Sequence, residues 1–445
     1  MKFRHLLLTA ALLATPVFAV DAALRELVAK KIAADYPALE KFYIDLHLHP
    51  ELSLMEEQTS AKVAAELRAA GFEVTEKFGG YGVVAMLKNG PGPTVLIRSD
   101  LDGLPVAEET GLSYASTVVT KDLSGTSVPV MHACGHDIHM SCLVGTARVL
   151  AAFRDRWSGT AILIGQPAEE RVLGARAMLA AGLYTKFPKP DFALAIHDSA
   201  TLPAGTVGTT EGFIMANVDT VDVTVFGLGG HGAAPHTTKD PIVLASRIVV
   251  ALQTIVSREM RPTDPAVVTV GSFHGGTKNN IIPNEVKLGI TLRSYSDEAR
   301  VHLVEAVKRI CRGEAIAAGL PDDKMPLVTV SPEGMSSTYN DPALTQRVHG
   351  AIAGWLGADA VKSIEPDMVS EDFSLFGRTA ERVPICLFRL GAIAPEKVAD
   401  SARTGMPLPS LHSSKFAPVP EPTIRTGITA MTAAVLDLLV KNERT

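Results

Sequence analysis

Residues 131–137 have the sequence MHACGHD, which places a thiol and an imidazole two positions apart, at Cys134 and His136. If this stretch is extended, both side chains project to the same side and could face one ion. Cysteine and histidine are zinc ligands, and manganese or cobalt also fits once carboxylates join them. A buried cysteine beside a histidine is common in ordinary cores, so the motif needs support from the rest of the chain.

Three apolar segments with the composition of buried strands are each followed by acidic or histidine residues. These are Asp100 and Asp102 after residues 94–97, Glu169 and Glu170 after residues 160–164, and His197 after residues 192–195. Open α/β sheets bind ligands at the carboxyl ends of their strands, so we expect these side chains to converge. One such cluster alone is typical of a solvated loop. With the Cys-x-His motif, and with His412 further downstream, they indicate a metal site.

The composition is that of a soluble globular protein of two or three domains. The chain has 445 residues, of which 47% are hydrophobic and 20% charged, and its formal net charge is -6 without a basic tract. Nucleic-acid binding therefore has no electrostatic support. Four cysteines are too few for a disulfide scaffold. We expect Cys142 to lie too far along a helix from Cys134 to bridge it. Cys311 and Cys386 are expected to be buried apolar residues, with a disulfide between them as the alternative.

The first 19 residues have the pattern of a secretory signal peptide. Lys2 and Arg4 precede an apolar run at residues 6–13, and small residues at 17–19 suit cleavage. The run is too short to span a bilayer, and the alternative is an N-terminal core helix. No later segment is predicted to cross a membrane. We therefore expect an exported soluble protein, periplasmic in a Gram-negative cell.

Two different patterns of secondary structure alternate along the chain. Residues 24 to about 210 mix helices and strands, as in an α/β layered domain, with predicted helices at 24–34, 59–70 and 138–153. The following stretch has the order βαββαβ of a ferredoxin-like unit. Its predicted strands are 219–226, 266–273, 285–293 and 327–330, and its helices are 241–257 and 297–318. The C-terminal part ends with a predicted helix at 424–440.

The sequence resembles the M20 metallopeptidase family in seven strings that occur in the family's order. The strings are LHLHPELS from Leu46, RSDLDGLP from Arg98, MHACGHDIH from Met131, QPAEE from Gln166, GGHGAAPH from Gly229, DPI from Asp240 and SEDF from Ser370. The resemblance is to the amidohydrolase branch, which contains hippurate hydrolases, N-acyl-amino-acid amidohydrolases and plant auxin-conjugate (IAA-amino acid) hydrolases.

The resemblance implies an α/β catalytic domain, a central sheet flanked by helices, interrupted by a ferredoxin-like βαββαβ domain that forms a lid and usually mediates dimerisation. Together with the pattern of elements along the chain, it gives predicted boundaries of 1–19 for the signal peptide, 24–213 and 331–445 for the catalytic domain, and 214–330 for the inserted domain. A homodimer is therefore expected.

The resemblance also implies a pair of divalent metal ions, manganese, zinc or cobalt. The implied ligands are Cys134, His136, Glu170, His197 and His412, with Asp102 orienting a ligand from behind. Asp100 lies where other branches carry a metal-binding histidine, and Cys134 takes over that role. His47 and His49 match positions that are not assigned to metal.

Four further residues receive catalytic or substrate-binding roles from the resemblance. Glu169 is the implied general base, although glutamate is also favoured in the first turn of any helix. His231 is expected to stabilise the oxyanion in the partner subunit; a turn histidine is the alternative, and His236 is a nearby competitor. Asn280 and Arg293 are expected to contact substrate, with a structural ion pair as the alternative for Arg293.

These residues predict hydrolysis of the amide bond of an N-acyl amino acid of the hippurate type. A dipeptidase or carboxypeptidase acting on short peptides is the alternative within the same fold. A non-catalytic binding protein is the alternative from another class, and the intact Glu169, Glu170 and five ligand candidates argue against it.

Overall fold

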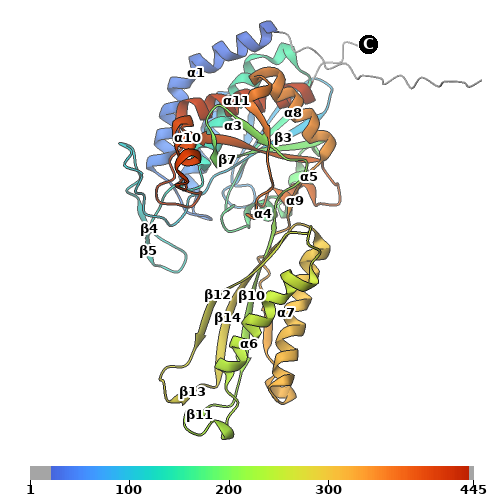
Figure 1. Cartoon of the computed structure of the whole chain (residues 1–445). Helices are drawn as coiled ribbons and strands as arrows, with labels where there is room; N and C mark the ends of the chain where they lie inside the picture. The colour runs from blue at the N-terminus through green and yellow to red at the C-terminus, as the bar shows by residue number, and fades with distance from the viewer. Residues whose placement is uncertain (1–21, 440–445) are drawn as a thin grey trace, which may run out of the picture.

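A computed structural model describes residues 22–439, and the predicted signal peptide lies outside them. A mixed eight-stranded sheet forms the centre of the larger domain (Figure 1). Its order is β1 (Glu73–Thr75), β2 (Val83–Asn89), β6 (Gly159–Gln166), β3 (Thr94–Asp100), β7 (Phe192–Pro203), β18 (Ile385–Ile393), β8 (Val207–Thr209) and β17 (Val361–Ser363).

Parallel pairing in the middle of this sheet aligns the ends of three strands. Asp100 at the end of β3 pairs with Gln166 at the end of β6, and Arg98 pairs with Ala195 on β7. Arg389 on β18 pairs with His197. Because parallel strands end at the same edge, the polar residues that follow them meet there.

Helices cover both faces of this sheet. One core contains α1 (Ala22–Leu48), α2 (Glu57–Ala69), α3 (His136–Ala152), α8 (Pro342–Leu356) and α11 (Pro420–Leu438). The other face carries the shorter helices α4 (Gly174–Ala180), α5 (Leu183–Lys186) and α9 (Ser374–Gly377). The four cysteines are buried and free, so the alternative of a disulfide between Cys311 and Cys386 is wrong.

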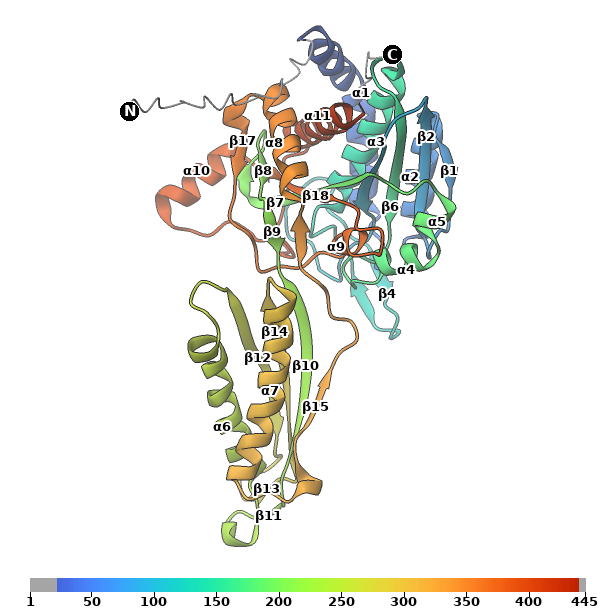
Figure 2. The ribbon, with the colours of Figure 1, turned by 90° about the vertical axis from the view of Figure 1, so that its right-hand side faces the viewer.

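The inserted domain extends away from the larger one and has a core of its own (Figure 2). Its antiparallel sheet has the order β12 (Ala266–Gly275), β14 (Glu285–Ser294), β10 (Asn217–Phe226) and β15 (Leu327–Val330). Helices α6 (Pro241–Thr254) and α7 (Asp297–Ala317) pack on it. The βαββαβ order is therefore present. A short ribbon of β11 (Gly230–His231) and β13 (Ile281–Ile282) forms the far tip.

The first helix is much longer than the sequence predicts. The expected helix covers residues 24–34, whereas α1 continues through Pro37 to Leu48. Proline removes one backbone donor, but Tyr36, Leu39 and Tyr43 continue the buried stripe that packs on α3 and α11. Tertiary burial therefore outweighs the local break.

Candidate metal centre

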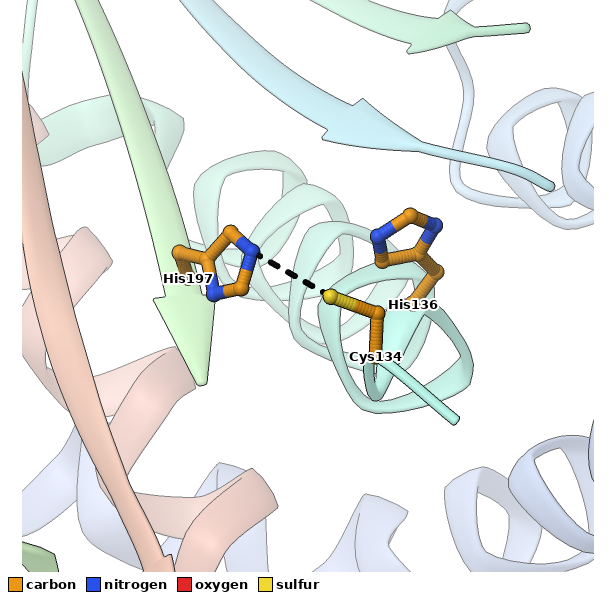
Figure 3. A group of neighbouring side chains, drawn as sticks. All are labelled: Cys134, His136 and His197. Carbon is orange, nitrogen blue, oxygen red and sulfur yellow. Dashed lines mark hydrogen bonds between the residues drawn. The ribbon is translucent and has the colours of Figure 1, made fainter. Parts of the chain in front are cut away.

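Cys134, His136 and His197 bring their ligand atoms together at the carboxyl edge of the large sheet (Figure 3). Cys134 Sγ lies 3.6 Å from His197 Nε2, and all three side chains are buried. The three ligand atoms lie within 4.8 Å of one another. A thiol and two imidazoles at this spacing can hold a borderline divalent cation.

Cys134 lies in a turn, so the extended geometry expected for the Cys-x-His motif is wrong. Gly135 precedes α3 with φ 80, a left-handed conformation that glycine adopts without strain. A Cβ at this position would lie 2.3 Å from Asp198 Oδ2. The turn, rather than strand alternation, therefore points Cys134 and His136 at the same place.

The two remaining ligand candidates complete the cluster from other segments. Cys134, Glu170 and His412 form a second group of ligand atoms within 4.8 Å of one another, and His136, Glu169 and Glu170 form a third. His412 Nε2 lies 3.4 Å from Glu170 Oε2, and its backbone N–H donates to Ala133 O at 2.8 Å. The structure therefore brings all five predicted ligands together in overlapping groups.

The cluster fits a divalent cation because two of its buried ligand atoms have no hydrogen-bond partner among the described residues. Among the described residues, neither His136 Nε2 nor Glu170 Oε1 has a hydrogen-bond partner. His136 Nδ1 lies 2.7 Å from Asp102 O, so we assign its proton to that nitrogen, which leaves Nε2 free to bind a metal. Unpaired buried polar atoms are costly, and a cation would satisfy them.

The electrostatics of the cluster also favour a cation. Burial, with help from Glu170 and Glu169, raises the pKa of the Cys134 thiol well above its usual value. Burial also raises the pKa of Glu170 to about 8. A bound divalent charge would reverse both effects and favour the thiolate and the carboxylate.

Asp102 supports both the histidine and the glutamate pair. Its carbonyl faces His136, and its carboxylate accepts hydrogen bonds from the backbone N–H groups of Glu169 and Glu170 at 3.2 and 3.0 Å. Ser53 Oγ donates to the same carboxylate at 2.5 Å. Asp102 therefore contacts His136 and the backbone of Glu170 from behind the ligand atoms.

A buried charge network that the sequence did not predict lies beside Glu169. Arg98 pairs with Asp100 and Glu371 at 2.7 Å and with Asp372 at 3.0 Å. Carboxylate oxygens of Glu169, Glu371 and Asp372 lie within 4.8 Å of one another. Burial, followed by Glu371, raises the pKa of Glu169 well above its usual range. The SEDF string was the sequence signal, but it did not show that its carboxylates reach the base.

The predicted residues of the inserted domain do not join this cluster in the same chain. His231 and Asn280 lie together at the far tip, where Gly232 N donates to Asn280 O at 2.9 Å (Figure 1). Arg293 lies near the other end of this domain and donates to Met368 O at 3.0 Å and Ser370 Oγ at 3.2 Å. No carboxylate among the described residues pairs with it, so the structural ion pair is wrong as an alternative.

His47 connects three segments around the site without facing the metal cluster. Its Nδ1 lies 2.6 Å from Asp137 Oδ2 and its Nε2 lies 3.1 Å from Glu108 Oε1, with all three side chains buried. Burial alone would lower the pKa of His47, but Asp137 and Glu108 raise it to about 10. The imidazolium therefore links the end of α1 to the start of α3 and to the loop at Glu108.

Replacing His47 by leucine is expected to lower the apparent free energy of unfolding by about 3–5 kcal/mol, because two buried carboxylates lose their partner. The folded-state pKa is raised, so this stabilisation is complete below about pH 6.5 and is lost as the pH rises through about 10. Urea unfolding from pH 6 to 10 measures both effects. His49→Leu is the matched control: its side chain is 58% exposed, so the change should stay below about 0.5 kcal/mol. Equal losses in the two variants would contradict the assignment.

Comparison with known proteins places this fold and site in one family. The chain matches the model of Peptidase family M20/M25/M40 over residues 96–404, and it belongs to that family. It is 35% identical to thermostable carboxypeptidase 1 of Saccharolobus solfataricus over 93% of this chain and 99% of the relative. It is 37% identical to the hippurate hydrolase of Campylobacter jejuni over 76% of this chain and 84% of the relative.

A solved structure gives the same result in three dimensions. A Bacillus subtilis protein, described as a dinuclear metal binding peptidase of the M20 family, superposes with a TM-score of 0.73. It is 29% identical, and the match covers 92% of this chain and all of that one. The protein is therefore a metal-dependent amidohydrolase or peptidase with the two-domain fold of this family.

Proposed function

We propose that the protein hydrolyses the amide bond of N-acyl amino acids, releasing a carboxylic acid and the free amino acid. The observation that carries this proposal is the position of Glu169. It is a buried carboxylate with a raised pKa, and it lies within 4.8 Å of the ligand atoms of His136 and Glu170. A carboxyl group held beside a metal cluster in this way is placed to accept a proton and to return it.

The mechanism divides the work between the ligand cluster and Glu169. A pair of divalent cations held by the five ligands would polarise the amide carbonyl and make a water molecule more acidic. Glu169 takes a proton from the attacking water and then delivers it to the departing nitrogen. Asp102 holds the backbone of Glu169 and Glu170, so the base and its neighbouring ligand keep a fixed relation.

Arg293 supports a substrate that carries a carboxylate. Its guanidinium is half-buried, and within the described part of the chain it donates only to neutral oxygens, those of Met368 and Ser370. Burial also lowers its pKa. A partly desolvated guanidinium without an anionic partner favours binding a carboxylate, and its fork of donors can grip both oxygens. The α-carboxylate of the amino-acid half of the substrate is the group we assign to it.

The partner we propose for the inserted domain is a second copy of this chain. Residues Pro241–Glu259 form the one helical stretch within 22–439 with the length and mean hydropathy, 1.4, to cross a membrane, but only 33% of it is buried. Leu244, Ile248 and Leu252 pack on the domain's own sheet. Val243 and Val250 are 58% and 71% exposed on the outer side. Such an apolar helix face supports burial against the same face of a partner.

A carboxypeptidase or dipeptidase activity is the second candidate. It is favoured by the likeness to the carboxypeptidase of Saccharolobus solfataricus over nearly the full length of both chains. Arg293 would suit a peptide's terminal carboxylate as well as an N-acyl amino acid. Export through the predicted signal at residues 1–19 would bring the enzyme to either class of substrate in the periplasm.

The proposal is tested by measuring hydrolysis of a panel of substrates after the metal has been removed and again after it has been restored. The panel contains N-benzoyl, N-acetyl and N-indoleacetyl amino acids and dipeptides, and the measurement is release of the free amino acid. We expect EDTA to abolish hydrolysis, and zinc, manganese or cobalt to restore cleavage of at least one N-acyl amino acid. Cleavage of dipeptides alone would favour the peptidase. No cleavage with any metal would favour the non-catalytic binding protein.

A further inference from the structure

The backbone just before the general base has a conformation that its sequence does not favour. Ala168 has φ 50, in the left-handed region that residues other than glycine rarely adopt, and it is fully buried. The next residue is Glu169, so the direction of the base depends on this conformation. Something must hold Ala168 there, because an alanine would otherwise relax to a negative φ.

One buried carboxylate oxygen accepts a hydrogen bond from Ala168. Glu56 Oε1 lies 2.8 Å from the Ala168 nitrogen and also 2.8 Å from the nitrogen of Leu54. Leu54 has φ 68, so both donors belong to residues in the left-handed region. Glu56 lies immediately before α2 and is itself completely buried, and its Oε2 has no partner among the described residues. The side chain therefore clamps two disfavoured turns to each other.

We call the hydrogen bonds from Ala168 and Leu54 to Glu56 the clamp. The bond to Ala168 is one of three consecutive backbone hydrogen bonds that hold the segment carrying the general base, Glu169. The N–H groups of Ala168, Glu169 and Glu170 donate to Glu56, Asp102 and Asp102 respectively. The backbone carbonyl of Asp102 also lies within hydrogen-bond distance of His136, one of the metal-ligand candidates. Within residues 22–439, Glu56 has no hydrogen bond or ion pair with a metal-ligand candidate or with the Glu169 side chain, so its direct contact with the base segment is the bond to the backbone of Ala168.

We propose that Glu56 is a positioning residue for the general base: its carboxyl oxygen holds Ala168 in the left-handed conformation and thereby directs Glu169 at the attacking water. This inference rests on the proposed function of Glu169. The clamp needs an oxygen at the right distance and does not need a negative charge. Burial, followed by the charge of Asp102, raises the pKa of Glu56 to about 7, and a neutral carboxyl oxygen accepts the same two bonds.

Three substitutions of Glu56 separate oxygen position from charge. Glu56→Gln keeps an acceptor at the same distance and should retain kcat within about threefold. Glu56→Asp keeps the charge but withdraws the oxygen by one methylene, and Glu56→Leu removes the acceptor. Both should lower kcat by about 100-fold, with little change in KM or metal content, because a displacement of about 1 Å at a reacting group has that effect. A larger loss for Glu56→Gln than for Glu56→Asp would overturn the proposal.

A second substitution at Ala168 tests whether the effect passes through the backbone. Glycine adopts a positive φ without strain, so Ala168→Gly combined with Glu56→Leu should recover kcat by about tenfold. Leu54→Gly combined with Glu56→Leu is the matched control, because Leu54 donates to the same oxygen from the same backbone region but does not precede a catalytic residue. This control should not recover kcat. Equal recovery by both, or recovery by neither, would overturn the proposal.

Hydrogen exchange of the segment at residues 166–174 gives a readout that does not depend on activity. Exchange at Ala168 should be faster in Glu56→Leu and Glu56→Asp than in the wild type and in Glu56→Gln. If the wild-type protein cleaves no substrate of the panel, the proposed function fails while this comparison still tests the clamp. If the wild type is active and exchange is the same in all four proteins, only the clamp fails.

Discussion

Replacing Glu169 by alanine is expected to lower kcat for N-acyl amino acid hydrolysis by about 10³-fold while bound metal stays at the wild-type level. The reason is the place of this carboxylate in the site. It lies within 4.8 Å of the ligand atoms of His136 and Glu170, but its raised pKa arises from burial and Glu371, which suits a group that carries a proton. Steady-state kinetics and metal analysis of the same preparation measure both quantities.

Glu170 provides the matched control because it is the adjacent glutamate in the same cluster. Glu170→Ala should lose bound metal as well as activity, since its Oε1 is one of the buried ligand atoms that have no hydrogen-bond partner among the described residues. The two variants therefore separate the roles of neighbouring carboxylates. Turnover in Glu169→Ala at the wild-type rate would remove Glu169 from the mechanism, and loss of metal in that variant would make it a ligand instead.

The elements of the fold were predictable where the local signal and the tertiary packing agree. The βαββαβ order of the inserted domain followed from alternation in its strands and from caps such as Asp240, whose side chain accepts a bond from Ile242 N at 2.8 Å. The length of α1 was not predictable in this way. Pro37 ends the local pattern, and the helix continues because α3 and α11 bury its next three turns.

The ligand cluster could be predicted, but the residues that position it could not. Metal ligands are recognised by residue type and by resemblance to short motifs, so Cys134 and His412 could be paired across 278 positions of sequence. The clamp joins Glu56 to Ala168, 112 positions apart, through a backbone N–H that has no side-chain signature. The clamp holds Ala168 at a positive φ, and this backbone conformation is not visible in the sequence. The contact between Arg98 and Glu371, which are 273 positions apart, could not be predicted from the sequence either.

His231→Ala is expected to lower kcat by about 10²–10³-fold, the usual effect of removing one oxyanion donor. The expectation depends on a second subunit. His231 lies on β11 at the far tip of the inserted domain, and Figure 1 shows β10, β12 and β14 between this tip and the larger domain, which holds the ligand cluster of the same chain. In the dimer that we propose, this tip would reach the partner's cluster instead.

Mixing two inactive variants decides whether His231 acts in the site of its own subunit or in that of its partner. In a hybrid of Glu169→Ala and His231→Ala chains, one site would combine an intact Glu169 with an intact His231 from the other chain, and the second site would lack both. Random pairing makes about half of the dimers hybrids, each with one working site of two, so about a quarter of the wild-type kcat should return. Co-expression with two affinity tags isolates the hybrid. If His231 acted within its own chain, every site in the hybrid would carry one defect and no activity would return. An unchanged kcat in His231→Ala alone would remove the residue from catalysis.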